Sequence, residues 1–274
     1  MDSNGIMYVS MQISESRETL HLEYTGQKRP GRYDDIVRAM SSIGWFMPPY
    51  GNQGRLDIVS REINNANGQF DEFEVERVLG FFYTPDRLAS MAINMYAQTP
   101  IVDLYKRTIA ESIAAHFSGL HHVAVAGLMP VVEGAGRELA CTRGLKHEGS
   151  VKAVFTELIT NAKEDAWARR IGNTQEIDDM LTGSLDFLTR YFFENSALYP
   201  LLDKTNRHGV LHGAYRDSDY GRPLNFYKTI SAVDILTFVS MLQTNKMTGF
   251  VPEHTADSKA LAERYCQLKT FKIL

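Results

Sequence analysis

The sequence has few residues of the kinds that build disulfide frameworks, zinc sites or membrane spans. Two cysteines, Cys141 and Cys266, occur in 274 residues, too few for a disulfide framework or a four-cysteine zinc site. Both lie among apolar neighbours in predicted helices, so we expect buried thiols. The longest apolar run, residues 123–132, contains Gly127 and Pro130 and is too short to cross a bilayer. The N-terminus lacks the pattern of a signal peptide, and we expect a cytoplasmic protein with no membrane partner.

An excess of positive charge is also missing. The formal net charge is -4 and the isoelectric point is about 6.1, so the charge of the whole protein does not attract nucleic acid. Any surface that binds RNA must therefore be local. The hydrophobic content of 44% is sufficient for a folded core. No internal period of the kind found in solenoids is present.

The first hundred residues predict a hairpin followed by short helices. Residues 6–13 and 20–24 alternate between apolar and polar side chains, which indicates a β-hairpin. From residue 33 the apolar period becomes helical, and it predicts short helices over residues 33–44, 54–66, 71–82 and 85–96. We interpret residues 1–100 as one region of hairpin and short helices.

The remaining residues, 101–274, predict a helical bundle, so the fold class is mainly α. Residues 119–142 are apolar on nearly every side, which is typical of a central helix. Pro130 is expected to kink this helix or to start a new one. The apolar pattern predicts helices over residues 101–118, 119–142, 150–171, 174–193, 203–212, 224–244 and 256–268.

The stretch Asn206–Gly213, with the sequence NRHGVLHG, concentrates side chains that transfer protons and bind anions. Arg207 and His212 are five residues apart, which is about 140° around an ideal helix. The two side chains therefore do not share a helix face. They can converge on one target only near a helix end, or in a groove where two copies of the chain meet.

His208 and His212 are four residues apart and do share a helix face. This spacing holds zinc in the His-Glu-x-x-His arrangement. Gly209 stands where that arrangement has its glutamate, and no third ligand is evident. We therefore predict no metal and no cofactor.

An arginine beside a histidine is suited to cleave RNA without metal. The histidine can deprotonate a 2′-hydroxyl or protonate the 5′-oxygen leaving group, and the arginine can stabilise the charge on the phosphate. Asn206 and His208 would then hydrogen-bond or steer the phosphate. In the alternative interpretation Asn206 caps a turn, Gly213 ends a helix and the histidines have no chemical role. The residues alone leave both interpretations open.

Glu133 lies in an apolar stretch, where an ionised carboxylate is costly unless it is paired. Arg137, one turn along the same predicted helix, is its simplest partner. Alternatively, Glu133 reaches across the bundle to Arg207 or His208 and orients that side chain. Both alternatives remain open.

Cations and aromatic residues flank the stretch. Lys204, Arg216 and Arg222 are candidates for contacts with a phosphate backbone, although three nearby aspartates (203, 217 and 219) offset their charge. Four aromatic residues also follow: Tyr215, Tyr220, Phe226 and Tyr227. Such rings can stack on bases, but core packing is their more common use.

The string from Arg207 to His212 resembles the motif of HEPN domains, an arginine and a histidine separated by four to six residues. More narrowly, the whole stretch is similar to an Asn-Arg-His-x-x-Leu-His-Gly signature in bacterial and prophage proteins, where a Tyr-Gly pair and a long apolar helix follow. Here these are Tyr220-Gly221 and residues 232–242. Glu133-Gly134 resembles the upstream helix of those proteins. The resemblance covers residues 101–250.

The resemblance implies a helical bundle that forms a homodimer, with both copies' motifs lining one cleft. It further implies a metal-independent endoribonuclease of the toxin, abortive-infection or antiphage type, with RNA as substrate and an antitoxin or regulatory partner. Arg207 and His212 would be the catalytic pair, supported by Asn206 and His208. Gly209 departs from the pattern, because glycine is a weak helix former. A non-catalytic scaffold and a nucleotide-binding module are the alternative functions.

Overall fold

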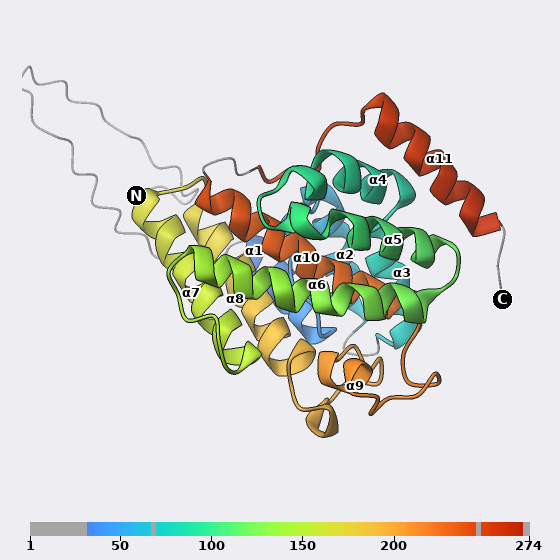
Figure 1. Ribbon diagram of the computed structural model, residues 1–274, viewed down its shortest axis with the longest axis horizontal. Coiled ribbons are helices and arrows are strands. Elements are labelled where there is room, and N and C mark those ends of the chain that lie inside the picture. The colour runs from blue at the N-terminus through green and yellow to red at the C-terminus, as the bar shows by residue number, and fades with distance from the viewer. Residues whose placement is uncertain (1–31, 67–69, 245–247, 271–274) are drawn as a thin grey trace, which may run out of the picture.

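The computed structural model describes residues 32–66, 70–244 and 248–270, which fold into helices without strands (Figure 1). The predicted β-hairpin of residues 6–24 lies outside the described residues. The helices are α1 (Arg32–Ser42), α2 (Gln53–Asn65), α3 (Glu72–Phe82), α4 (Pro85–Asn94), η1 (Tyr96–Gln98), η2 (Val102–Tyr105), α5 (Lys106–Phe117), α6 (His121–Thr142), α7 (Val151–Arg169), α8 (Thr174–Phe187), η3 (Leu188–Phe192), η4 (Ser196–Leu198), α9 (Arg207–Leu211), α10 (Pro223–Gln243) and α11 (Ala256–Thr270).

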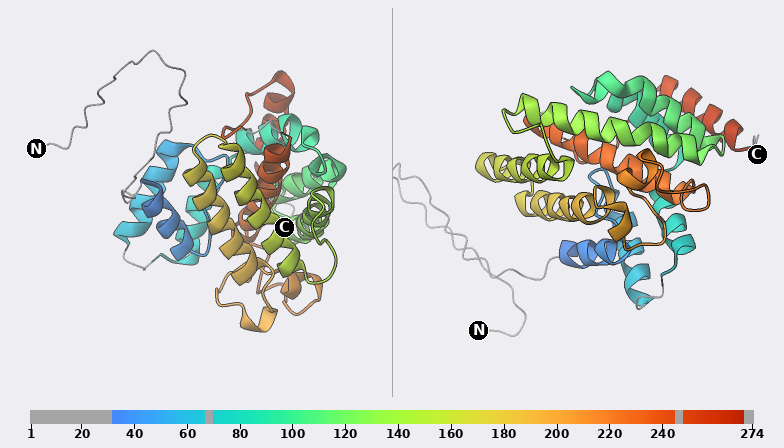
Figure 2. Two further views of the ribbon diagram at one scale, coloured as in Figure 1. Left: turned by 90° about the vertical axis from the view of Figure 1, so that its left-hand side faces the viewer. Right: turned by 60° about the horizontal axis from the view of Figure 1, so that its bottom comes forward.

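Helix α10 is the centre of the bundle. Nearly all of its residues are buried, as expected for a helix that is apolar on every side. It packs against α6 along one side and also contacts α3, α7 and α8, while α5 and α6 form the layer that covers it (Figure 2). The short helix α9 lies at one end of this bundle, where it contacts α6.

The prediction of a mainly helical bundle is confirmed, and most of the predicted helices match the observed ones to within a few residues. The helix predicted over residues 203–212 is shorter in the structure, where α9 covers Arg207–Leu211. One hydrophobic core contains buried side chains from both sides of residue 100. The division into regions 1–100 and 101–274 stays a prediction. The segment predicted as one helix over 174–193 divides into α8 and the π-helical turn η3.

Pro130 lies inside α6, which is one continuous helix. No new helix starts there, contrary to one of the two expected outcomes. Pro130 is on the exposed face of α6. On that face water can satisfy the backbone carbonyl that loses its helical partner, so the proline is tolerated.

Both cysteines are exposed, so the prediction of buried thiols was wrong. Cys141 follows buried Leu139 and Ala140 but points away from the core, and Cys266 follows buried Tyr265 in the same way. Apolar neighbours along the chain do not fix which face of a helix a residue occupies.

The apolar side chains of α6 and α10 face other helices of the bundle. Within the described ranges, no helix combines the length and the hydropathy needed to cross a bilayer.

We predict that the imidazole of His116, on α5, makes stability depend on pH. The ring is 4% exposed and stacks on Phe226 at 3.9 Å between centroids. Burial, together with His121 and Lys269, lowers its pKa well below the usual 6.5. Unfolding therefore takes up a proton below pH 6.5, and stability is lost as the pH falls. Between pH 6.5 and 5, the free energy of unfolding in urea should fall more steeply for the wild type than for His116→Phe, by up to about 1.4 kcal/mol per pH unit. The same dependence of the free energy of unfolding on pH in both proteins would contradict this.

Candidate functional site

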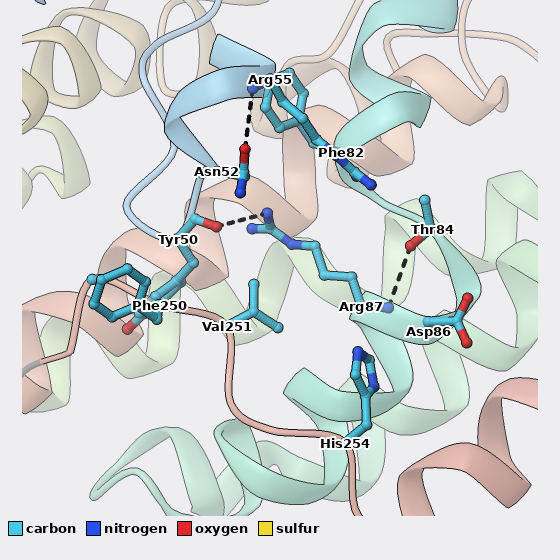
Figure 3. A pocket seen from close by; sticks show the side chains of 12 residues that line it. Tyr50, Asn52, Arg55, Phe82, Thr84, Asp86, Arg87, Phe250, Val251 and His254 are labelled. Carbon is cyan, nitrogen blue, oxygen red and sulfur yellow. Dashed lines mark hydrogen bonds between the residues drawn. The ribbon is translucent and has the colours of Figure 1, made fainter.

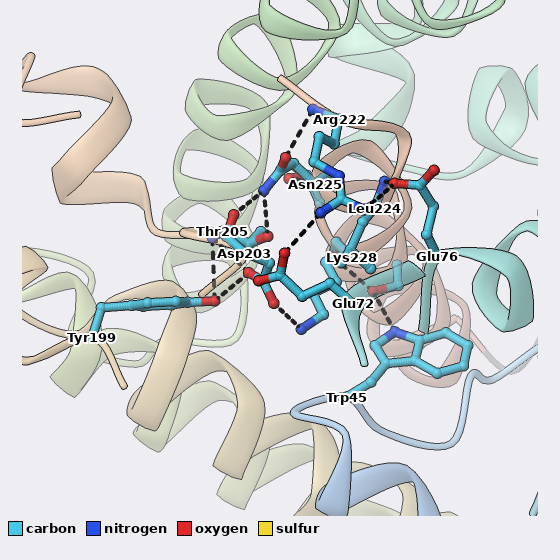
Figure 4. A network of polar contacts seen from close by, with 12 residues as sticks. Trp45, Glu72, Glu76, Tyr199, Asp203, Thr205, Arg222, Leu224, Asn225 and Lys228 are labelled. Carbon is cyan, nitrogen blue, oxygen red and sulfur yellow. Dashed lines mark hydrogen bonds and ion pairs between the residues drawn. The ribbon is translucent and has the colours of Figure 1, made fainter. Parts of the chain in front are cut away.

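The chain that leads into α9 is held by a buried carboxylate (Figure 4). Asp203 Oδ2 accepts from Lys228 Nζ of α10 at 2.5 Å, and the two side chains are 5% and 1% exposed. Asp203 Oδ1 accepts from the Tyr199 hydroxyl at 2.6 Å and from the Thr205 backbone N–H at 2.8 Å. Asn225, at the start of α10, donates to Thr205 Oγ1 at 2.9 Å. These contacts fix the position at which α9 begins.

The aspartate of this network is charged. Burial acts to raise its pKa, but the Lys228 ammonium and the hydrogen bonds from Lys228 and Tyr199 hold the pKa of Asp203 below its usual value. Because the charge of Asp203 is paired with Lys228, Asp203 does not offset the charge of Lys204. The sequence had suggested that it does. The network also takes residues 203–205 out of the predicted helix. Lys204 has a φ of 55°, and α9 covers only residues 207–211.

Asn206 is the N-cap of α9. Its Oδ1 accepts from the Gly209 N–H at 2.8 Å, and its Nδ2 donates to the carbonyls of Tyr191 and Glu194 at 2.8 Å each. The residue is 0% exposed, so every contact of the amide is with backbone. The structure thus gives Asn206 the capping position and no surface from which to reach a phosphate directly.

Gly209 makes room for an aromatic ring. A Cβ at this position would lie 2.0 Å from Tyr215 Cε2, and the Tyr215 N–H donates to the Gly209 carbonyl at 3.0 Å. The loop after α9 therefore folds back over this glycine. Gly209, the departure from the HEPN pattern, is explained by this close approach rather than by helix propensity.

Arg207 and His212 meet within one chain. Arg207 Nη1 lies 2.9 Å from His212 Nε2. The helix ends directly after Leu211, so His212 is its C-cap and Gly213 follows with a φ of 68°. The separation of about 140° applies to a helix that continues, and here it does not. The expected convergence near a helix end is what the structure shows, and a second copy is not needed to bring the pair together.

Glu133 joins both of the partners considered for it. Its Oε1 pairs with Arg137 at 3.1 Å along α6, and its Oε2 pairs with Arg207 at 2.6 Å across to α9. The side chains of Glu133 and Arg207 are 18% and 17% exposed. Two guanidiniums share one carboxylate, which leaves a net positive charge beneath His212.

His208 lies beside His212, with the ring centroids 5.5 Å apart. Partial burial, followed by the charges of Arg207 and His212, lowers the pKa of His208, while Glu133 and Glu194 act in the opposite direction. The His208 ring is therefore neutral at neutral pH. The two histidines open onto a shallow depression of about 280 Å³ whose other walls are Asn195, Ser196 and Ala214.

The described ranges contain no group of three or more His, Cys, Asp or Glu side chains that could hold a metal ion. The carboxylate of Glu133 is already paired with two arginines, Arg137 and Arg207, and so does not complete a metal site with His208 and His212. The arrangement fits an anion better than a cation.

The three cations expected to bind substrate lie in different surroundings. Lys204 has its ammonium 5.9 Å from the Tyr199 ring centre and 5.8 Å from that of Tyr215, so it remains beside α9. Arg216 is exposed in the loop that follows. Arg222 is bound by two carboxylates of α3, Glu72 at 2.7 Å and Glu76 at 3.2 Å. These ion pairs compete with any contact between Arg222 and a phosphate backbone.

The aromatic residues mostly pack. Phe226 is fully buried, and Tyr227 stacks on Tyr83 at 5.7 Å. Tyr220 lies edge-on to His122, whose ring occupies the space beside Gly221. Position 221 favours glycine for two reasons: its φ is 92°, and the His122 ring leaves no room for a Cβ.

Sequence reasoning missed the buried pair of Asp203 and Lys228, the ring of Tyr215 over Gly209, and the contact of His122 with Gly221. A signal existed only for the first. A lysine within the apolar run of residues 224–244 requires a buried partner.

No protein-family model, curated protein or solved structure matches the chain significantly. The likeness to HEPN domains therefore rests on the residues of the motif alone and stays a prediction.

We predict that Gly209→Ala lowers the free energy of unfolding by about 1–3 kcal/mol, because the added methyl group overlaps the Tyr215 ring. Urea unfolding measures this loss. In the double variant with Tyr215→Ala, the cost of Gly209→Ala should fall to less than half. The control is Gly249→Ala, where a Cβ meets no atom of the described residues within 4 Å. Full additivity of the two substitutions would refute the close approach.

Proposed function

We propose that the protein is a metal-independent endoribonuclease, with Arg207 and His212 as its catalytic pair. The observation that carries the proposal is the contact of 2.9 Å between the guanidinium and the imidazole. An exposed histidine held against a permanently charged phosphate ligand is the minimum apparatus for transfer of a phosphoryl group to a 2′-hydroxyl. Glu133 supports this pair by holding the Arg207 guanidinium through an ion pair.

The proposed reaction uses the 2′-hydroxyl of RNA as nucleophile. In the free protein His212 Nε2 accepts a hydrogen bond from Arg207 Nη1, so the neutral ring carries its proton on Nδ1. When a phosphate draws Nη1 away, Nε2 becomes free to take the proton of the 2′-hydroxyl. The oxygen then attacks phosphorus, and the protonated ring returns the proton to the departing 5′-oxygen. The products are a 2′,3′-cyclic phosphate and a 5′-hydroxyl.

The carboxylate of Glu133 limits how far Arg207 moves during this exchange. Nη2 stays on Oε2, and Nη1 can turn between the imidazole and the phosphate. His208, neutral because its pKa is lowered, offers one N–H to a phosphate oxygen. The remaining positive charge of the three side chains Glu133, Arg137 and Arg207 favours an anionic substrate.

The proposal includes a cytoplasmic homodimer of the toxin, abortive-infection or antiphage type, regulated by an antitoxin or a similar partner. Two exposed leucines support an interface close to the site: Leu198 is 69% exposed and Leu202 is 81% exposed. Both leucines lie in the segment between η3 and α9. A second copy here would extend the depression beside His208 and His212 into a longer cleft.

The alternative is a non-catalytic scaffold, which one observation favours. The ion pair of Glu133 with Arg207 ties α9 to α6, and such a tie is sufficient reason for both residues without any chemistry. A nucleotide-binding role for the same cluster stays a prediction.

We predict that the purified protein cleaves single-stranded RNA in EDTA and leaves 2′,3′-cyclic phosphate ends. His212→Ala should lower the rate at least about 100-fold, since it removes the group that moves the proton. Glu133→Gln should lower it about tenfold, because Arg207 loses its anchor. Gel analysis of an RNA panel, with enzymatic typing of the ends, measures both.

The control is Lys259→Ala, which removes an exposed cation of α11 and should leave the rate unchanged. Cleavage by His212→Ala at the wild-type rate would refute the catalytic assignment. A wild type that leaves every RNA intact, with a His212→Ala variant that only melts at lower temperature, would favour the scaffold.

A further inference from the structure

Three histidines lie where α5 ends and α6 begins, outside the proposed catalytic site. His116 is in the last turn of α5, and His121 and His122 are the first two residues of α6 (Figure 1). Leu120, which precedes them, makes no side-chain cap for α6. The polar side-chain contacts of this helix end are therefore those of the two histidines.

The imidazoles of His116 and His121 contact each other directly. Their Nδ1 atoms lie 3.2 Å apart. A hydrogen bond between two such nitrogens requires that one carries a proton and the other accepts it. When both rings are fully protonated, each Nδ1 is a donor and the hydrogen bond is lost. The closed pair can therefore hold at most one extra proton, whereas two separated rings can hold two.

The surroundings of His116 do not compensate a positive charge. The ring is 4% exposed. Other buried cations have acceptors: the guanidinium of Arg87, 7% exposed, donates to the Tyr50 carbonyl at 3.0 Å (Figure 3) and to Asp234 at 3.1 Å. For His116, burial, the facing imidazole and the Lys269 ammonium of α11 all lower the pKa, and no carboxylate among the described residues acts against them.

The other elements around the pair add no negative charge. From α10 the rings of Phe226 and Tyr227 face His116, and burial raises the pKa of Tyr227 to about 12, so its hydroxyl stays neutral. Burial, followed by the charge of His122, lowers the pKa of His121. Both imidazoles of the pair are therefore neutral at neutral pH, and the contact is closed.

His122 connects the start of α6 to the loop of residues 213–222, which joins α9 to α10. Its Nε2 donates to the Asp217 carbonyl at 3.2 Å, and its ring lies against Tyr220 and Gly221. Protonation of His122 itself keeps this hydrogen bond, because Nε2 is the donor in both states. The loop can be released only if the first turn of α6 moves.

We propose that the contact between His116 and His121 is an acid-sensitive latch on the loop of residues 213–222. When both rings are positively charged they separate, the first turn of α6 moves, and His122 releases the loop. Tyr215, which this loop places over α9, leaves with it. Acid thus opens the end of the bundle that carries the candidate site. The proposal does not rest on the cleavage of RNA.

The direction of the pH dependence follows from the protons that each form binds. Separated rings take up protons below the usual histidine pKa of about 6.5, and the closed pair does not bind the second proton. Acidification below pH 6.5 therefore favours the open form. The opening equilibrium should rise by up to about tenfold per pH unit.

Hydrogen exchange in the full chain, followed by NMR, tests the proposal. The reporter is the backbone amide of Tyr215, which donates to the Gly209 carbonyl. After correction for the intrinsic effect of pH on exchange, its protection factor should fall by up to about tenfold per pH unit between pH 6.5 and 5. Far-UV circular dichroism should show that the bundle stays helical over this range.

Two variants separate the latch from other titrating groups. His121→Asn keeps a side chain that can donate to His116 or accept from it, so the protection of the Tyr215 amide should no longer depend on pH. His122→Ala cuts the connection to the loop, so the protection should be at least about fivefold lower at pH 7 and should not fall further in acid.

The matched control is His147→Asn, which removes a histidine of the loop between α6 and α7 that contacts only the Leu145 carbonyl. It should keep the pH dependence of the wild type. Protection of the Tyr215 amide that does not change with pH in the wild type would overturn the proposal. A fall of the wild-type steepness in His121→Asn would do so as well, because another group would then be titrating.

Discussion

The carboxylate of Glu133 is the group on which the arrangement around α9 depends. It projects from a helix that is otherwise largely apolar, and an ion in such a position is costly unless its oxygens are paired. Each oxygen has one arginine: Arg137 holds the carboxylate along α6, and Arg207 brings α9 to it. The same ion pair that satisfies Glu133 thus places the Arg207 guanidinium against His212. The pairing of the Glu133 carboxylate therefore also determines the geometry of the candidate site.

The helix that carries the site has little stability of its own. A helix of five residues is far shorter than an isolated helix needs to be in water. Its start is fixed by the Asn206 cap and by Asp203, which is paired with Lys228 of the central helix. Its end is fixed by Gly213 and by the ring of Tyr215 over Gly209. Contacts with other segments of the bundle therefore position α9, through Asn206 at its start and Arg207 in its first turn.

The sequence predicts the parts of this structure that depend on local patterns. Apolar periodicity located the long helices because each buries a continuous face, and the concentration of polar groups in residues 206–213 identified the site segment. The sequence left open whether Arg207 and His212 converge near a helix end or between two copies, because the predicted helix ran to residue 212 whereas α9 ends at Leu211. The buried pair of Asp203 and Lys228 and the Tyr215 ring depend on tertiary contacts. The exposed cysteines show the same limit, because neighbours along the chain do not reveal which face of a helix meets the core.

The coupling between Glu133 and Arg207 tests this account most directly. In a double-mutant cycle of Glu133→Gln and Arg207→Gln, measured by urea unfolding, we predict a coupling energy of at least about 1 kcal/mol. The exposed pair of Arg107 and Glu111, whose side chains are 90% and 69% exposed, should give less than about 0.5 kcal/mol in a matched cycle. Additive effects of the Glu133 and Arg207 substitutions would show that the carboxylate does not hold the arginine, and would contradict the account.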